Sequence, residues 1–117
     1  MRTIVLKPGE QGEIIELPDE MESQIMRLQE IVGGWIEHVV LPKHHNGFIN
    51  EEGKFKDLPW NHFATELCRL ARRLPSTEII VGPMVIVGPV DNNGDQSSVT
   101  DEFIKYLKHL KMVKNGK

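Results

Sequence analysis

At 117 residues, the chain is long enough to bury one core and too short for a separate cofactor-binding domain. Its net charge of -3 and pI of about 5.9 argue against the dense basic surface of a duplex-binding protein. The single Cys68 excludes an intramolecular disulfide and a cysteine-rich zinc site, which fits a reducing cytoplasm.

The chain also lacks the signals of membrane insertion and export. No apolar run reaches the roughly 20 residues that a membrane helix needs, and the N-terminal segment lacks the apolar core of a signal peptide. We therefore expect one cytoplasmic domain over residues 1–113, followed by a frayed tail at residues 114–117.

A hairpin and a helix are predicted first. Residues 3–7 and 13–17 are short segments rich in β-branched and apolar side chains on either side of a glycine-bearing turn, which predicts two paired strands. Asp19 and Glu22 have capping-box spacing at the start of the helix. The paired glycines at 33 and 34 end it, because glycine reaches the left-handed conformation without a Cβ clash. One helix face carries the apolar residues Met21, Ile25, Leu28 and Val32.

From Trp35 the apolar period changes to two. Residues 35–41 form a mostly apolar run, which predicts a central strand covered on both faces. Asn46-Gly47 predicts a two-residue hairpin turn into residues 48–50, and residues 51–53 form an acidic tip. A strand, a helix and a strand in succession permit a right-handed parallel crossover, and hence a mixed sheet.

The second half predicts two more helices and a strand. Asn61 is expected to cap a helix that ends at Pro75 and buries Phe63, Leu67, Leu70 and Leu74. Residues 78–87 are β-prone, but Gly82-Pro83 interrupts them, which predicts a bent strand near the sheet edge or two short strands. Thr100 is expected to cap the last helix. The whole pattern predicts a compact α+β domain with a mixed β-sheet of about five strands and three helices.

Residues able to carry chemistry are scattered. His44 and His45 are adjacent and cannot both face one metal ion from regular structure. Residues 91–95 lack the length and the final glutamate of a calcium loop. Cys68 follows the buried Leu67 and is interpreted as a packing residue. We expect neither a metal nor a cofactor.

One set of polar positions is predicted to converge. It combines the glycine pair at the end of the first helix and the adjoining Trp35 with the end of the hairpin and the start of the second helix. Free backbone N–H groups there, with one amide and one hydroxyl, suit a small polar or anionic ligand. The alternative is that Asn50 and Asn61 are a turn residue and a helix cap. The predicted ligand-binding residues are Gly33, Gly34, Trp35, Asn50, Glu51, Asn61 and Thr65.

The order and spacing of several segments resemble a known family. The matching positions are residues 28–37, 50–54, Asn61, Ala64, Thr65, 80–82 and 85–88. They resemble domain of unknown function 3846, a family known mainly from phages, plasmids and other mobile elements of bacteria. The resemblance covers roughly residues 1–90 and departs at Pro83, where family members usually carry an acidic residue. It implies a biological setting and brings no established activity.

Small size, the absence of a catalytic cluster and this setting favour a non-enzymatic protein that acts by binding. We expect it to counter host defence or redirect host metabolism in a bacterial cytoplasm, by binding a host protein or sequestering a small nucleotide-like signal. The alternative is a small enzyme that uses Glu51 or Glu52 with Asn61 in acid/base chemistry. We expect no nucleic-acid or membrane partner, and the amphipathic C-terminal helix offers a surface for a homo-oligomer.

Overall fold

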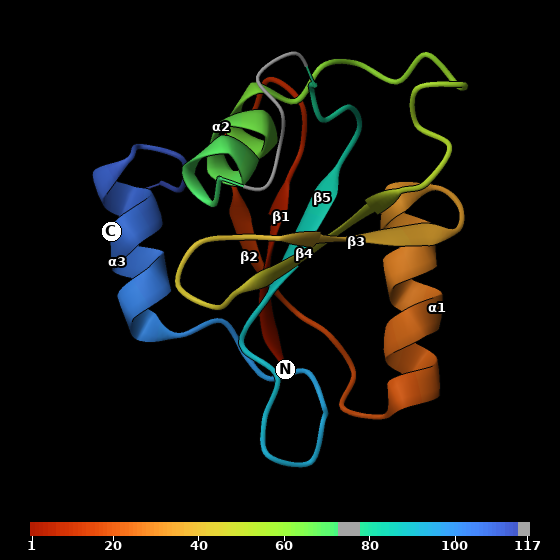
Figure 1. The fold of residues 1–117 in the computed structure, drawn as a ribbon. Coiled ribbons are helices and arrows are strands. Elements are labelled where there is room, and N and C mark those ends of the chain that lie inside the picture. The colour runs from red at the N-terminus through yellow and green to blue at the C-terminus, as the bar shows by residue number, and fades with distance from the viewer. Residues whose placement is uncertain (73–77, 115–117) are drawn as a thin grey trace.

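The computed structural model describes residues 1–72 and 78–114 (Figure 1). These residues form five strands: β1 (Arg2–Leu6), β2 (Glu13–Glu16), β3 (Ile36–Val40), β4 (Asn46–Asn50) and β5 (Met84–Val87). They also form three helices: α1 (Met21–Val32), α2 (His62–Leu70) and α3 (Asp101–His109). The predicted α+β class and element count are confirmed. None of the helices in the described residues has the length and apolar character to cross a membrane.

All the strands belong to one sheet with the order β2-β1-β5-β4-β3. Each pair of neighbouring strands is antiparallel, whereas a mixed sheet was expected. The predicted first hairpin is confirmed as β1 and β2. Helix α1 crosses from β2 at one edge of the sheet to β3 at the other. Four antiparallel pairings separate these two strands, so they run parallel, as the crossover requires, but they are not neighbours and add no parallel pair to the sheet.

Strand β5 occupies the centre of the sheet, so its predicted place near an edge was wrong. It pairs with β1 on one side and β4 on the other, and all four of its residues are buried. Pro83 precedes the first residue of the ladder and therefore removes no ladder hydrogen bond. Gly82, with φ of +77°, makes the bend between β5 and the isolated bridge that joins Val81 to Trp60.

Strand β3 lies at the edge of the sheet, so its predicted central position was also wrong. Its residues are half-buried or exposed, and Trp35 just before it is 68% exposed. The apolar run at residues 35–41 suggested a strand with neighbours on both sides, but β3 is the last strand of the sheet. Its single strand partner within the described residues is β4.

The turn between β3 and β4 falls at Lys43-His44 rather than at Asn46-Gly47. Lys43 and His44 have φ of 58° and 62°, and the backbone N–H of His45 donates to the carbonyl of Pro42 at 3.2 Å. This is a two-residue turn with both central residues left-handed.

Gly47 serves close packing inside the sheet instead of a turn. A Cβ at Gly47 would stand 2.9 Å from the sulfur of Met84 and 3.0 Å from a methyl group of Val39. The glycine therefore lets β4 approach the side chains of the neighbouring strands. The Asn46-Gly47 pair looks like a turn signal, and the sequence alone does not distinguish a glycine needed for a turn from one needed for close packing.

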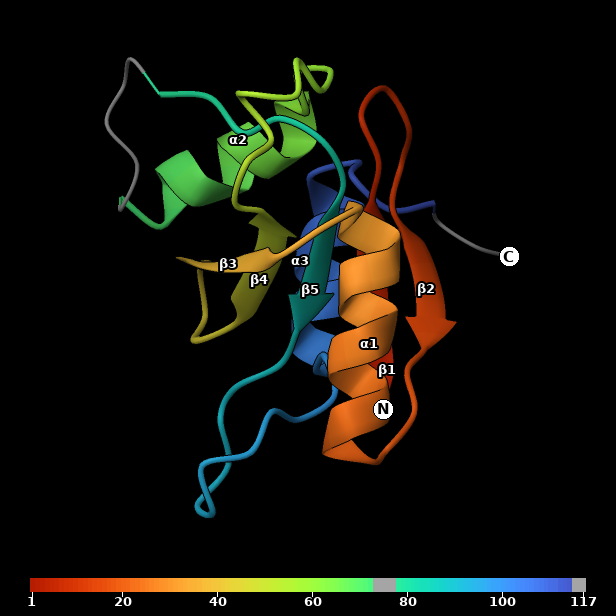
Figure 2. The ribbon, with the colours of Figure 1, turned by 90° about the vertical axis from the view of Figure 1, so that its right-hand side faces the viewer.

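Helices cover both faces of the sheet. Figures 1 and 2 show α3 on one side of β5 and α1 on the other. The side chains of β1 and β5 alternate between two buried clusters. The cluster beneath α2 and α3 includes Ile4, Leu6, Met84, Ile86, Leu67, Phe103 and Leu107. The smaller cluster beneath α1 contains Val5, Val85, Leu17, Leu28 and Val32.

The helix ends follow the sequence signals in most places. Gly33 caps α1 in the left-handed conformation, with φ of 86°, as predicted. The predicted capping box is wrong: Glu20 takes the N-cap position without a side-chain hydrogen bond, because Asp19 binds the N-terminal ammonium instead. Thr100 caps α3 by accepting a hydrogen bond from the backbone N–H of Phe103 at 3.1 Å.

Helix α2 ends earlier than its apolar pattern suggested. Asn61 caps it as predicted, but the last helical residue, Leu70, is 42% exposed. Leu67 is buried as predicted, Phe63 is partly buried, and the rest of the buried face consists of Ala64, Thr65 and Cys68. The predicted core residue Leu74 and the terminating Pro75 lie outside the described residues.

Candidate functional site

The structure brings two of the three predicted segments together at Asn50. Its side-chain amide donates to the carbonyl of Val32 at 3.1 Å, and its Oδ1 accepts from the backbone N–H of Glu52 at 2.7 Å. The backbone N–H of Glu51 donates to the carbonyl of Trp35 at 3.0 Å. A Cβ on Gly34 would lie 3.1 Å from the Asn50 amide, so the glycine pair packs against this side chain. Asn50, which is 4% exposed, holds the end of α1 to the end of β4.

Asn61 and Thr65 form a second buried polar cluster on the other face of the sheet. The Asn61 amide donates to the carbonyls of Leu6 at 3.0 Å and Gly82 at 2.9 Å, and its Oδ1 accepts from the N–H of Ala64 at 3.1 Å. The Thr65 hydroxyl donates to the carbonyl of Asn61 at 2.8 Å. Asn61 is 1% exposed and Thr65 is 2% exposed. Their polar atoms therefore satisfy buried backbone groups rather than face solvent.

This geometry matches the structural alternative for Asn50 and Asn61, a turn residue and a helix cap. Glu51 and Glu52 are exposed on the turn after β4, and the amide of Asn61 is already occupied by backbone groups. The acid/base alternative therefore gains no support from the arrangement. Ligand binding by the seven predicted residues stays a prediction.

A groove of about 820 Å³ lies in a different place, between the first half of α1, one end of the sheet and the loop at residues 91–98. We call it the α1 groove. Its apolar lining consists of Met1, Met21, Ile25, Leu28, Ile36, Phe48 and Val87. Its polar lining consists of Asp19, Gln24, Asp91, Asp95, Gln96, Ser97 and Ser98.

The start of α1 extends past the sheet, and this overhang creates the groove. Met21 is 60% exposed and Ile25 is 41% exposed, whereas Leu28 and Val32 farther along the same face are buried. The sequence pattern placed all four side chains on one helix face. A regular apolar stripe shows which face of a helix packs against the core, but it does not show how much of the helix length the rest of the protein covers.

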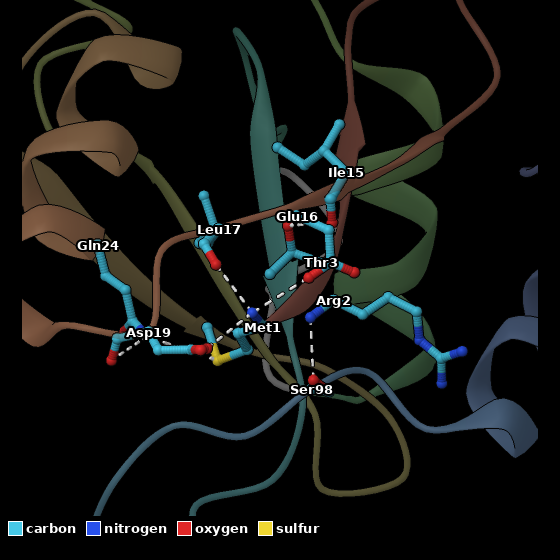
Figure 3. Close-up of polar contacts among 9 residues, drawn as sticks. All are labelled: Met1, Arg2, Thr3, Ile15, Glu16, Leu17, Asp19, Gln24 and Ser98. Atoms are coloured by element: carbon cyan, nitrogen blue, oxygen red, sulfur yellow. Dashed lines mark hydrogen bonds and ion pairs between the residues drawn. The ribbon is translucent and has the colours of Figure 1, made fainter.

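The N-terminal residues join the two walls of the groove (Figure 3). The Met1 ammonium donates to the carbonyl of Leu17 at 2.8 Å and pairs with the carboxylate of Asp19 at 3.1 Å. The hydrogen bond with Asp19 raises the pKa of this ammonium, and burial opposes the shift. On the other side, the backbone N–H of Arg2 donates to the Ser98 hydroxyl at 2.9 Å. The start of β1 therefore links the α1 wall to the loop wall.

The loop wall is itself a hydrogen-bonded turn. The Asp91 carboxylate accepts from the backbone N–H groups of Asn93 at 2.9 Å and Asp95 at 3.0 Å. The backbone N–H of Asp91 donates to the carbonyl of Asp95 at 2.8 Å. The sequence showed only a polar loop here, because nothing local reveals that it packs beside a helix some seventy residues earlier.

The charge of the groove is one-sided. Three carboxylates line it, from Asp19, Asp91 and Asp95, and no lysine, arginine or histidine is among the described residues that line it. The ammonium of Met1 neutralises one of the three. An apolar floor with an acidic rim suits a ligand that joins apolar groups to cationic ones, and it repels phosphates.

The remaining reactive groups are spread over the part of the chain that the structure describes. In the described residues, no three His, Cys, Asp or Glu side chains are grouped so that they could hold a metal ion. Cys68 is buried, and its burial raises the pKa of the thiol to about 11. The thiol is therefore protonated at neutral pH and is a poor nucleophile.

Comparison with known proteins gives a family and no activity. No curated protein and no solved structure matches the chain. A family model described as Domain of unknown function (DUF3846) matches residues 1–113. With nearly the whole sequence covered by that match, the chain belongs to the DUF3846 family.

Proposed function

We propose that this protein acts by binding a segment of another protein in the α1 groove, and that the segment carries apolar side chains flanked by lysine or arginine. The observation that carries the proposal is the acidic rim above an apolar floor. Met21 and Ile25 offer apolar surface that a partner would bury, at roughly 25 cal/mol per Å². The rim carboxylates would attract the cations and orient the segment.

Of the two binding modes expected from the sequence, this groove favours a protein partner over a nucleotide-like signal. A bound nucleotide would place its phosphates beside Asp19, Asp91 and Asp95, where like charges repel. Together with the setting of the resembled family, this supports an accessory protein of a phage or mobile element that acts in the host cytoplasm by inhibiting a host protein.

Backbone NMR spectra of the ¹⁵N-labelled protein test the proposal directly. The probes are two extended peptides of equal length, one alternating leucine with lysine and the other alternating leucine with glutamate. We expect the lysine peptide to shift signals from residues 19–28 and 91–98, and we expect the glutamate peptide to leave them unchanged. Equal shifts with both peptides would contradict an acidic binding rim.

Two substitutions on α1 locate the binding surface. Ile25→Asp should weaken binding of the lysine peptide by at least about tenfold, because it places a charge in the apolar floor of the groove. Met26→Asp is the matched control, since Met26 is 64% exposed on the same helix and does not line the groove. Equal effects of the two substitutions would place the binding surface elsewhere.

The nucleotide alternative is tested by titrating ATP and a cyclic dinucleotide into the same labelled protein. Signal changes confined to residues 33–35, 50–51, Asn61 and Thr65 would move the site to the positions predicted from the sequence. Such a result would also overturn the α1 groove as the primary site.

A further inference from the structure

The outer edge of β3 carries backbone groups that have no partner in the described part of the chain. The N–H of Leu41 donates to the carbonyl of His45, and the N–H of Glu51 donates to the carbonyl of Trp35. In an antiparallel ladder the backbone groups of every second residue point toward the neighbouring strand, so the N–H and C=O groups of Glu37 and Val39 also face β4. The N–H and C=O groups of the alternate residues Ile36, His38 and Val40 therefore point away from the sheet.

The two edges of the sheet differ in their protection. At the β2 edge, the N–H of Gly12 donates to the carbonyl of Met112 at 2.6 Å, and the Gln11 side chain donates to the carbonyl of Lys111 at 3.1 Å. The segment after α3 therefore covers the start of that edge. Residues 35–41 contain no proline and no lysine, and β3 pairs with β4 in unbroken register. Such an unprotected edge is a template for another strand.

We propose that β3 pairs antiparallel with β3 of a second copy of this chain, with His38 at the centre of the pairing. A symmetric antiparallel pair has its two-fold axis perpendicular to the sheet, so one residue must face its own copy. With His38 there, Ile36 lies opposite Val40 of the second copy. The outward groups of all three residues on both strands are then hydrogen-bonded.

The neighbouring registers are less favourable. Centring the pair on Glu37 places two carboxylates directly opposite each other, which destabilises a strand pair. Centring it on Val39 leaves the groups of Ile36 without a partner. In the His38 register Glu37 lies opposite Val39, so no like charges meet on that face. The His38 ring is already held by Asn46, whose Oδ1 lies 2.7 Å from Nε2.

This arrangement also accounts for an exposed tryptophan at the strand end. Trp35 is 68% exposed, and the same register places it opposite residue Leu41 of the second copy. Pairing would cover part of the indole, and burial of that apolar area favours association. Ile36 and Val40, both partly exposed, would meet on the opposite face.

The pairing has a consequence for the α1 groove, which rests on the proposed function. A two-fold axis perpendicular to the sheet keeps the same face of both copies on the same side. Ile36, which lines the groove, would then lie beside Val40 of the second copy. The dimer would present two grooves on one surface, and a partner with two binding segments would gain affinity by occupying both.

Sedimentation velocity over a range of protein concentrations, without any peptide, tests the pairing independently of the groove. We expect a concentration-dependent dimer of the wild-type chain. Val40→Pro should convert it to a monomer with an unchanged far-UV circular dichroism spectrum, because the lost N–H faces outward rather than toward β4. Ile14→Pro is the matched control, since it alters the β2 edge, and it should remain dimeric.

Val40→Lys provides a second variant that leaves the backbone intact. A charge at this edge position should also give a monomer. A wild-type chain that stays monomeric at all concentrations would overturn the proposal, even if an extended peptide bound to β3. A dimer that survives both Val40 variants would overturn it too, because the contact would then lie elsewhere, as on α3.

Discussion

Replacing Asn61 with alanine removes three hydrogen bonds from one buried point. Its Oδ1 accepts from the N–H of Ala64, and its amide donates to the carbonyls of Leu6 and Gly82. Leu6 belongs to β1, and Gly82 lies just before β5, so Asn61 ties α2 to the two strands at the centre of the sheet. Alanine would leave one N–H and two carbonyls buried without these partners.

The size of the effect follows from these contacts. Loss of an N-cap side chain costs about 1 kcal/mol, and each of the two other buried hydrogen bonds contributes about 1 kcal/mol, with more lost if a carbonyl stays unpaired. We expect Asn61→Ala to lower the free energy of unfolding by about 3–4 kcal/mol. Thr100→Ala is the matched control, because it removes a cap from α3 and should cost about 1 kcal/mol.

Urea unfolding followed by far-UV circular dichroism measures both changes. Asn61→Ser, which keeps a capping oxygen and loses the two carbonyl bonds, should fall between the wild type and Asn61→Ala. If Asn61→Ala were no more destabilising than Thr100→Ala, the two carbonyl bonds would contribute nothing. Asn61 would then act as a helix cap alone and would not join α2 to the sheet.

Two further predictions concern a histidine and a glycine. Burial lowers the pKa of His45, whose Nε2 accepts a hydrogen bond from the N–H of Thr100 at 3.2 Å. The folded protein therefore favours the neutral imidazole. The contribution of His45 to the free energy of unfolding is complete above the unfolded-state pKa of about 6.5 and declines as pH falls below it. Urea unfolding between about pH 8 and pH 5 should show this decline, and a decline that persists unchanged in His45→Gln would contradict the assignment. Gly88→Ala should lower stability by about 3 kcal/mol or more in thermal unfolding, because the added Cβ would overlap the backbone of Ser98. A Cβ at Gly9 would meet open space, so Gly9→Ala at φ of +77° should lower stability by only about 1–2 kcal/mol. Equal losses of stability in Gly88→Ala and Gly9→Ala would refute the steric explanation.

Local chemistry made several elements predictable from the sequence. Asn61 and Thr100 each cap a helix through the side-chain oxygen that their residue type supplies. Gly33 ends α1 because its left-handed backbone favours glycine. Each of these features depends on residues within one helical turn, so a short window of sequence contains the needed information.

Strand order depends on contacts that no short window contains. The apolar run at residues 35–41 suggested a central strand, and Pro83 suggested an edge, yet β3 is the edge and β5 the centre. Proline is harmful in a strand only where its missing N–H would join a ladder, and Pro83 stands just before β5. The pairing partners of β5 are β1 and β4, which are distant from it in sequence.

The candidate site shows the same limit. Residue type left Asn50 and Asn61 open between ligand binding and the roles of turn residue and helix cap. It could not show that the side chains of both residues hydrogen-bond to backbone groups. The α1 groove combines residues 19–28 with residues 91–98, and no local pattern relates the two segments. The spacing of Met21 and Ile25 placed them on the apolar face of a helix, but it could not show that they stay exposed, because exposure is a property of the folded chain.

The central position of β5 determines when the sheet can be completed during translation. Until Met84 and the residues after it leave the ribosome, the only pairings of this sheet that the nascent chain can make are β1 with β2 and β3 with β4, and no strand is available to join β1 to β4. Both of those strands then present a bare flank to chaperones or to neighbouring chains. Synthesis of a single late strand closes both flanks at once.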